Sequence, residues 1–474
     1  MKNVFFNSKD NRTIVERALL RGADFAEIFD EKSVINTITI NSRNIIQNDT
    51  RYESGLGLRI FIGDEIQYQW TDDFSERGIS DLISKIKESP TSHKKVEYRP
   101  FKKTSFPEVS RVKISSDKTP VKRKLEYLRE VEHLIYDYDP RVKDVILLYY
   151  DKTQNVVIAN SERSFVQGKR CDIILIAIAL VQHNGSYSIG GSFTGGSIGT
   201  EIFDKESPEK IAHEVAVQAL EGINPRPISQ EKMPIIFSNK SGVFHECLGH
   251  PLEARHRDGV FKDKLGEQLT PQRLTVIDDA TIPGLGASYS FDDEGTQSKR
   301  NVLIDKGLLK GFMYDRYYAK KYGVESTGNG RRASYKFSPL TRMSNLIIEA
   351  GNIPFEDMIK ETRQGILVGS GFGGGRSFVY EGNYMLPFYS AFYIENGKIA
   401  YPIQPFVYQG TILKTLQDIE MIGNDFIQFP TGRCGLEQVI TVTYGAPSVK
   451  LKEAEIMNPL EINQLIETMK NLKI

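Results

Sequence analysis

The stretch "INPRPISQEKMP" at residues 223–234 divides the chain into two halves of different character. It places three prolines between a helix-like segment that ends near residue 222 and an apolar strand-like segment, "PIIFS", that begins at residue 234. Prolines and polar residues between two periodic segments are typical of a linker between domains. We therefore predict an N-terminal domain over residues 1–222, a linker over 223–233 and a C-terminal domain over 234–474.

The N-terminal half combines helical and strand patterns. Helical spacing through Ile14, Ala18 and Leu19, and again over residues 121–139 and 207–222, predicts three helices, and "ISDLISKIKES" (79–89) predicts a fourth, short one. Alternating apolar residues predict antiparallel strands over 26–47, 55–71 (with a turn at Gly63–Asp64), 142–151, 154–170 and 171–182. Residues 89–120 lack periodicity and are predicted to be a long connection. These patterns predict a mixed domain with an antiparallel sheet and helices.

The C-terminal half is rich in strand patterns that glycines interrupt, as in "RNVLIDKGLLKGFMYD" (300–315) and "SAFYIENGKIAYPI" (390–403). We predict a β-rich, barrel-like domain there, which also carries a helix with clustered histidines. The fold class that follows for the whole chain is α+β.

The bulk composition excludes several classes of function. The 474 residues include 61 Lys plus Arg and 61 Asp plus Glu, so no overall charge recruits nucleic acid or anionic lipid. The longest apolar run, "IILIAIALV" at 173–181, is far shorter than the roughly 20 residues of a membrane helix and is predicted to be a buried strand. Three cysteines and the absence of a signal-peptide core near the first residue favour a reducing, cytoplasmic location.

Three of the seven histidines lie in "HECLGHPLEARH", residues 245–256. In the zinc-peptidase pattern "HExxH", two histidines four residues apart share one face of a helix, next to a carboxylate that deprotonates water. Here His245 and His250 are five apart, which on a regular helix places them about 140° apart. Either a π-type widening, or an end of the helix between them, is needed for both to reach one metal. Gly249 is expected to loosen the backbone at this point.

Two side chains compete as a third ligand. His256 follows His250 by six residues, but zincins need a glycine three residues after the second histidine, and Glu253 stands there. Since "PLEARHR" is predicted to continue the helix, His256 is expected beside the site and not in it. Cys434, in "FPTGRCGLEQV", lies between glycines where a thiolate can project. A pair of structural histidines, with Cys434 as a small buried residue, is the alternative.

Seven blocks in order resemble the TldD/PmbA family, also called modulators of gyrase, and in particular its TldD-type metallopeptidase subunit that carries HExxxH. They are "GVFHECLGHPLEARH" (242–256), "SFDDEGTQSKRNVLIDKGLLKGFMYD" (290–315), "TGNGRRASYKFSPLTRMSN" (327–345), "GFGGGRS" (371–377), "YIENGKIAYPI" (393–403), "MIGND" (421–425) and "GRCG" (432–435). The resemblance implies one zinc ion per chain held by His245, His250 and Cys434, with Glu246 as general base. It also implies an extended peptide bound as a strand, and a homodimer or a heterodimer with a related subunit that lacks the metal motif.

Some features outside the ligand set are open to two interpretations. Arg331 and Arg332 in "GRRASY" either belong to a solvated loop or bind a substrate carboxylate or backbone carbonyls. The resemblance implies that the glycines of "GSGFGGG", including Gly373 and Gly374, shape the cleft. "DDEG" at 292–295 is predicted to be a turn with solvated acids and not a calcium site. The function predicted is a zinc-dependent peptidase for unfolded or extended peptides. The alternative is a non-catalytic regulatory or binding module with a structural metal.

Overall fold

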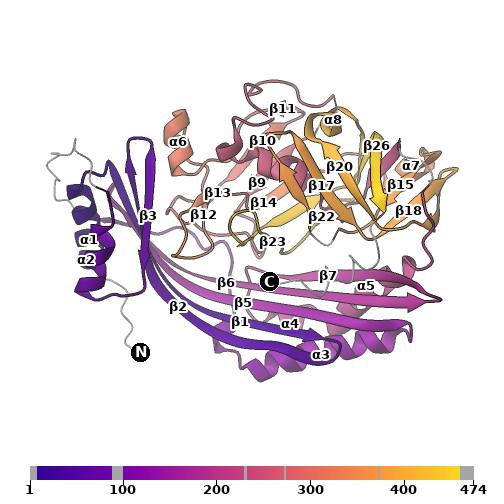
Figure 1. The fold of residues 1–474 in the computed structure, drawn as a ribbon, viewed down its shortest axis with the longest axis horizontal. Helices are drawn as coiled ribbons and strands as arrows, with labels where there is room; N and C mark the ends of the chain where they lie inside the picture. Colours follow the sequence, from indigo (N-terminus) through magenta and orange to yellow (C-terminus); the bar gives the residue numbers. More distant parts are fainter. Residues whose placement is uncertain (1–7, 88–99, 229–231, 272–273, 372–373, 460–474) are drawn as a thin grey trace.

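A seven-stranded sheet with helices on one face forms the N-terminal part (Figure 1). The computed structural model describes residues 8–87, 100–228, 232–271, 274–371 and 374–459. The strands run in the order β3-β2-β1-β5-β6-β4, with β7 also paired to β6, and only the β4–β6 pair is parallel. The elements are α1 (Ser8–Leu20), β1 (Phe25–Asn41), β2 (Asn44–Ile62), β3 (Glu65–Thr71), α2 (Glu76–Ser84), β4 (Lys102–Thr104), η1 (Ser116–Lys118), α3 (Val121–Tyr138), β5 (Val142–Asn160), β6 (Ser164–His183), β7 (Ser186–Gly196), α4 (Ile202–Lys205) and α5 (Pro208–Glu221).

The central strands of this sheet are buried on both faces. Along β5, Leu147 belongs to one apolar cluster with Leu128 of α3 and Val215 of α5. Leu148 points to the opposite face and belongs to a second cluster with Ile178 of β6. Because successive side chains of a strand alternate between faces, a strand covered on both sides has a nearly continuous apolar sequence. This explains the run at 173–181, which lies within β6 as predicted. Within the described residues, no helix combines the length and apolar character needed to cross a membrane.

Most predicted elements of this part are present. The turn at Gly63–Asp64 joins β2 to β3, with Gly63 at a φ of 58°. Residues 100–120 contain only the short β4 and η1, as expected for a connection, while residues 88–99 lie outside the described ones. The prediction of three separate strands over 142–182 was wrong, because β5 and β6 are two long strands that turn at residues 161–163.

The C-terminal part is β-rich, as predicted, but its sheets are open. A nine-stranded sheet has the order β16-β17-β20-β26-β8-β15-β18-β19, with β21 on β26, and a six-stranded sheet has the order β11-β10-β9-β14-β25-β22. Among the described strands, the two ends of neither sheet pair with each other, so the barrel-like closure is absent. The strands are β8 (Lys232–Phe237), β9 (Val276–Asp279), β10 (Arg300–Asp305), β11 (Leu308–Leu309), β12 (Gly330–Arg331), β13 (Leu340–Thr341), β14 (Asn345–Ile348), β15 (Gln364–Val368), β16 (Arg376–Phe378), β17 (Asn383–Phe388), β18 (Ala391–Glu395), β19 (Lys398–Pro402), β20 (Phe406–Thr411), β21 (Ile419–Ile422), β22 (Ile427–Gln428), β23 (Arg433–Cys434), β24 (Ile440–Thr441), β25 (Thr443–Ala446) and β26 (Val449–Pro459).

Short helical elements connect these strands and cover one large apolar core. They are η2 (His245–Gly249), η3 (His250–Leu252), η4 (Ala254–His256), α6 (Arg316–Tyr322), α7 (Phe355–Lys360) and α8 (Ile412–Gln417). Figure 1 shows this part lying over the face of the N-terminal sheet opposite to α3 and α5. The candidate site therefore lies between two layers that come from different halves of the sequence.

Buried ion pairs join the two parts. Arg59 of β2 lies 3.2 Å from Glu27 of β1 and 2.6 Å from Glu294 of the C-terminal part. Arg332 reaches the same Glu27 at 3.0 Å from the C-terminal side. All four side chains are at most 1% exposed, so these charges depend on one another and on nearby protein groups and not on solvent. The domain boundary at residues 223–233 stays a prediction. The parts of the chain before and after it are joined by buried ion pairs.

The prediction that "DDEG" is a turn with solvated acids was wrong. Its acidic side chains are all buried. Asp293 is ion-paired with Arg170 of β6, and Glu294 with Arg59. The segment is a turn, but it packs against the N-terminal sheet, where arginines from the other half of the chain pair with Asp293 and Glu294.

Candidate metal centre

The two histidines of the motif meet because the backbone widens between them. Residues His245–Gly249 form a π-helical turn, and a 3₁₀ turn, His250–Leu252, follows directly. A π turn carries one extra residue, so positions five apart return to the same side. The imidazole centroids of His245 and His250 are consequently 5.0 Å apart. The first of the two predicted geometries is thus present.

Two expectations about this segment were wrong. Gly249 has an ordinary helical φ of −57°, and its lack of a side chain serves packing, since a Cβ there would lie 2.6 Å from Cε of Met343. "PLEARHR" does not continue as one helix, because Glu253 is extended, with ψ at 125°, between two 3₁₀ turns. The chain therefore changes direction at Glu253, which carries the side chain that holds His250.

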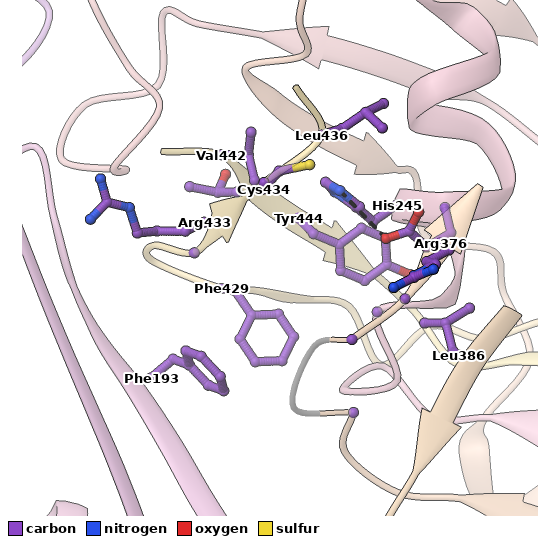
Figure 2. Close-up of a pocket in the computed structure, with 18 of the residues that line it drawn as sticks. Phe193, His245, Arg376, Leu386, Phe429, Arg433, Cys434, Leu436, Val442 and Tyr444 are labelled. Atoms are coloured by element: carbon purple, nitrogen blue, oxygen red, sulfur yellow. Dashed lines mark ion pairs between the residues drawn. The ribbon is translucent and has the colours of Figure 1, made fainter. Parts of the chain in front are cut away.

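Three donor atoms converge at this place. One ligand atom each from His245, His250 and Cys434 lies within 4.8 Å of the other two, and the Cys434 Sγ to His250 Nε2 distance is 3.4 Å. Cys434 comes from β23, which pairs with β24 and is nearly 200 positions further along the chain. Figure 2 shows the Cys434 thiol and the His245 imidazole pointing toward one another.

The donor set suits zinc in chemistry and in charge. Two imidazole nitrogens and one thiolate are a common ligand set for this ion. Burial raises the pKa of the Cys434 thiol, but the neighbouring imidazoles of His245 and His250 outweigh it and lower the pKa to about 4. Cys434 is therefore a thiolate at neutral pH, which is the form that binds metal.

Glu253 fixes the orientation of His250. Its Oε1 lies 3.2 Å from His250 Nδ1, and both side chains are buried. With Nδ1 facing this carboxylate, Nε2 is the nitrogen that faces Cys434, which is the arrangement that metal-binding histidines usually adopt. Burial raises the pKa of Glu253, but Arg255 and His250 reverse the effect and hold it well below its ordinary value.

Arg342 connects Glu253 to the segment that follows Cys434. Its guanidinium lies 3.4 Å from Glu253 and donates to the carbonyl oxygens of Leu436 at 2.7 Å and Gln438 at 3.0 Å. Arg342 is completely buried. Neither role was predicted from the sequence, although Arg342 lies in the "RM" of a block quoted for the family resemblance. The Glu253–Arg342 ion pair thus connects the segment that carries His250 with the segment that carries Cys434.

Glu246 lies beside the same donors. Its carboxylate oxygens are 3.9 Å from the Nε2 atoms of His245 and His250. Gly375 packs directly against it, because a Cβ on Gly375 would lie 2.8 Å from Glu246 Cγ. Glu246 is buried but lines the adjoining cleft, so its carboxylate faces the space that a ligand would enter.

The cleft at this site has walls from both parts of the protein and a volume of about 710 Å³. Leu148, Ile176 and Phe193 reach it from the N-terminal sheet. On the other side, β16 lines it with residues 376–378, and β16 is the last strand of its sheet. Figure 2 shows Phe193 and Phe429 on one side of the histidine and cysteine pair and Leu386 on the other.

Other predicted site residues lie elsewhere. His256 is outside the donor cluster, with its ring 3.8 Å from Glu253. Arg332 is engaged by Glu27, and Arg331 donates to the Met343 carbonyl at 2.6 Å. Both arginines line a smaller pocket and not the cleft. Their contacts are with other parts of the protein, so the structure does not support the prediction that they bind substrate in the cleft.

Gly374 lines the cleft with a φ of 83°, whereas Gly373 is not among the described residues. Cys171 and Cys247 are buried free thiols away from the cluster. Burial, only partly offset by a hydrogen bond with Tyr384, raises the pKa of Cys247, so it is a neutral thiol in the core. The small side chain that the motif carries there is thus a packing residue.

Known proteins share this architecture over nearly the whole chain. The model of the PmbA/TldA metallopeptidase central domain matches residues 114–223, and that of the C-terminal domain matches residues 230–458. A metalloprotease of Methanocaldococcus jannaschii is 30% identical over 443 residues, covering 91% of this chain and 97% of the relative. A protein named zinc metalloprotease TldD homolog, from Saccharolobus solfataricus, is 24% identical and covers 93% and 98%.

Solved structures show the same fold. A Thermotoga maritima protein described as a modulator of DNA gyrase superposes with a TM-score of 0.76 at 21% identity, covering 94% of this chain and 98% of that one. TldE of Thermococcus kodakarensis superposes with a TM-score of 0.74 at 20% identity, covering 94% and 99%. With two family models over most of the chain and a full-length relative at 30% identity, the chain belongs to the PmbA/TldD family of metallopeptidases.

Proposed function

We propose that the chain is a zinc-dependent peptidase that hydrolyses unfolded or extended peptides. The observation that carries this proposal is the three-donor cluster with Glu246 beside it, facing a cleft. His245, His250 and Cys434 would hold one zinc ion. When bound, zinc supplies Lewis acidity, which polarises a carbonyl oxygen and makes a nearby water molecule easier to deprotonate. The name of the Saccharolobus solfataricus relative supports zinc as the metal.

Glu246 is proposed as the general base. Its carboxylate is next to the ligand imidazoles and would take the proton from the attacking water, then deliver it to the leaving amine. The contact with Gly375 restricts the carboxylate to this position. Glu253 and Arg342 would keep His250 oriented while the proton moves.

The substrate is proposed to lie as an added strand along β16. Among the described strands β16 pairs only with β17, which leaves its other edge without a neighbouring strand, and β16 lines the cleft. A peptide held by its main chain is selected for being extended more than for its sequence. A cleft of about 710 Å³ is far too small for a folded domain, which is consistent with an extended peptide.

The rival function, a regulatory module with a structural metal, requires a fourth protein ligand or a closed site. Among the described residues the cluster has three members, and it opens onto the cleft, which favours catalysis. We also propose a cytoplasmic dimer, either of two copies or with a related subunit that lacks the metal motif. A relative solved under the name TldE shares the fold and is the model for such a subunit.

The test is Glu246→Gln, measured as zinc per chain and as cleavage of an unfolded, internally quenched peptide. Glutamine keeps the shape but accepts no proton, so we expect full zinc content and a loss of turnover of at least about 100-fold. The matched control is Glu395→Gln, at an exposed strand end, which should leave both unchanged. Zinc-loaded wild-type protein that leaves every unfolded peptide intact would favour the structural-metal alternative.

A further inference from the structure

The cleft is lined by more positive than negative side chains. Lys240, Arg376 and Arg433 line it, against a single carboxylate, Glu246. The whole chain carries equal numbers of acidic and basic residues, so this excess is local and does not reflect a basic protein. A basic lining raises the local concentration of anionic ligands.

The positive charges are not neutralised by neighbours. The ion pairs among the lining residues join Glu246 only to His245 and His250. In the part of the chain that the structure describes, neither Arg376 nor Arg433 has a carboxylate within ion-pair distance. The exposed Arg376 guanidinium is therefore open to an anion in the cleft, and that of Arg433 to an anion at the border between the cleft and the smaller pocket that Tyr150 and Asp172 line.

Arg433 is held in place for such a role. Its guanidinium stacks on the Tyr150 ring at 4.1 Å from the centroid, and its buried Nε has no hydrogen-bond partner. Asp172 faces it from the adjoining small pocket, but one oxygen of that carboxylate accepts from Thr441 and the group lies beyond ion-pair distance. A buried donor without a partner is costly unless a ligand satisfies it.

The two arginines lie on opposite sides of the metal centre. Figure 2 shows Arg433 on one side of the His245 and Cys434 pair, with its guanidinium pointing away from the pair, and Arg376 on the other side. Arg376 belongs to β16, the edge strand along which the substrate is proposed to lie. An extended peptide that spans the centre would therefore pass both cations, one before and one after the scissile bond.

We propose that the cleft selects peptides that carry a carboxylate within a few residues of the scissile bond, bound by Arg376 or Arg433. The carboxylate is either an Asp or Glu side chain or the free C-terminus of the peptide, since both present the same two oxygens to a guanidinium. This inference rests on the proposed peptidase function and adds the substrate class to it. The apolar walls, with Phe193 and Phe429, make peptides of mixed acidic and apolar composition the best match.

The experiment uses the zinc-loaded full-length protein and three unfolded peptides of one apolar sequence. The first contains Glu near the scissile bond and has an amidated C-terminus, the second has Gln in its place, and the third has Gln with a free C-terminus. We expect kcat/KM about fivefold higher for the Glu peptide than for the Gln peptide, the range of a partly exposed ion pair. A gain for the third peptide alone would assign the preference to the terminal carboxylate. The preference should weaken in 1 M salt, where the Debye length is about 3 Å.

Substitutions of the two arginines test whether they cause the preference for a carboxylate, independently of folding and of basal cleavage. Arg376→Gln and Arg433→Gln together should abolish the preference while the Gln peptide is still cleaved, and the two Lys versions should keep it. Lys310→Gln, an exposed cation outside the cleft, is the matched control. Affinity of the same peptides for the Glu246→Gln protein, by fluorescence anisotropy, gives a readout that needs no turnover.

Equal cleavage and equal binding of the Glu, Gln and free-terminus peptides would overturn the carboxylate preference and leave the peptidase function standing. Absence of any cleavage, with selective binding in the anisotropy assay, would instead reject the peptidase function and keep the cleft as a site for acidic peptides. An unchanged preference in the double Gln variant would overturn the assignment to Arg376 and Arg433.

Discussion

Replacing Glu253 by glutamine tests how the ligand side chains are held. The Glu253 carboxylate is fully buried and is 3.2 Å from His250 Nδ1, 2.9 Å from Arg255 Nε and 3.4 Å from Arg342 Nε. Glutamine keeps the shape but removes the charge and turns one oxygen into a donor that faces other donors. Removal of one partner from a buried ion pair costs about 3–5 kcal/mol of unfolding free energy. Loss of the carboxylate behind a metal-binding histidine costs about 10- to 100-fold in metal affinity.

The assay is zinc affinity by chelator competition at pH 7, with the urea midpoint of the metal-free protein measured separately. The control is Glu437→Gln, which removes the exposed partner of Arg255 and should change stability by less than about 1 kcal/mol and zinc affinity not at all. Because the pKa of Glu253 is lowered on folding, its contribution is present above the ordinary pKa and is lost only as the pH falls through the lowered one. Zinc affinity within threefold of wild type, with an unchanged urea midpoint, would refute this account of how His250 is positioned.

Three further substitutions address the ligand set and the general base. Cys434→Ala should fold, with circular dichroism like that of the wild type, and lose zinc and peptide cleavage, while Cys171→Ala keeps both; full zinc occupancy in the first variant would reject the two-histidine, one-cysteine site. His256→Ala should leave zinc per chain unchanged, because the ring lies outside the donor cluster, and loss of stoichiometric zinc would restore it as a ligand. Gly375→Ala should keep zinc but lower kcat by about 10-fold or more, since the new Cβ would lie 2.8 Å from Glu246 Cγ and displace the base; normal kcat would show that the position of this carboxylate is not critical.

Local patterns in the sequence predicted those features that depend on local geometry. The apolar run at 173–181 could be read as a buried strand because the pattern of burial follows the chain. The widening between His245 and His250 could be predicted because only a few backbone shapes bring side chains five apart together. Cys434 could not be assigned in this way, since its contact with His250 spans 184 positions, and only the family resemblance pointed to it.

Buried charges were the features that the sequence did not reveal. Acidic and basic residues are usually exposed, so "DDEG" was interpreted as a solvated turn, and Arg332 as either part of a solvated loop or a substrate contact. Whether a charge is buried depends on a partner such as Glu27 or Arg59, which comes from a distant strand. In the sequence, Glu253 was noted only because it replaces the glycine of the zincin pattern. In the structure it orients His250, a proposed metal ligand. The ion pairs between the N-terminal sheet and the C-terminal part can be identified only once the tertiary structure is known.

The buried charges between the layers also constrain how this protein can change over generations. Glu27 and Arg59 come from one half of the sequence, and Glu294 and Arg332 from the other, and each side chain is at most 1% exposed. A recombinant that took one half from a distant relative would leave a charge unmatched, at about 3–5 kcal/mol, out of a stability that is commonly about 5–15 kcal/mol. The proline-rich segment at 223–234 looks like a suitable point for recombination. The ion pairs Arg59–Glu294 and Arg332–Glu27, however, join residues from the two sides of this segment. The two halves should therefore be inherited together, and exchanges of one half between distant relatives should be rare.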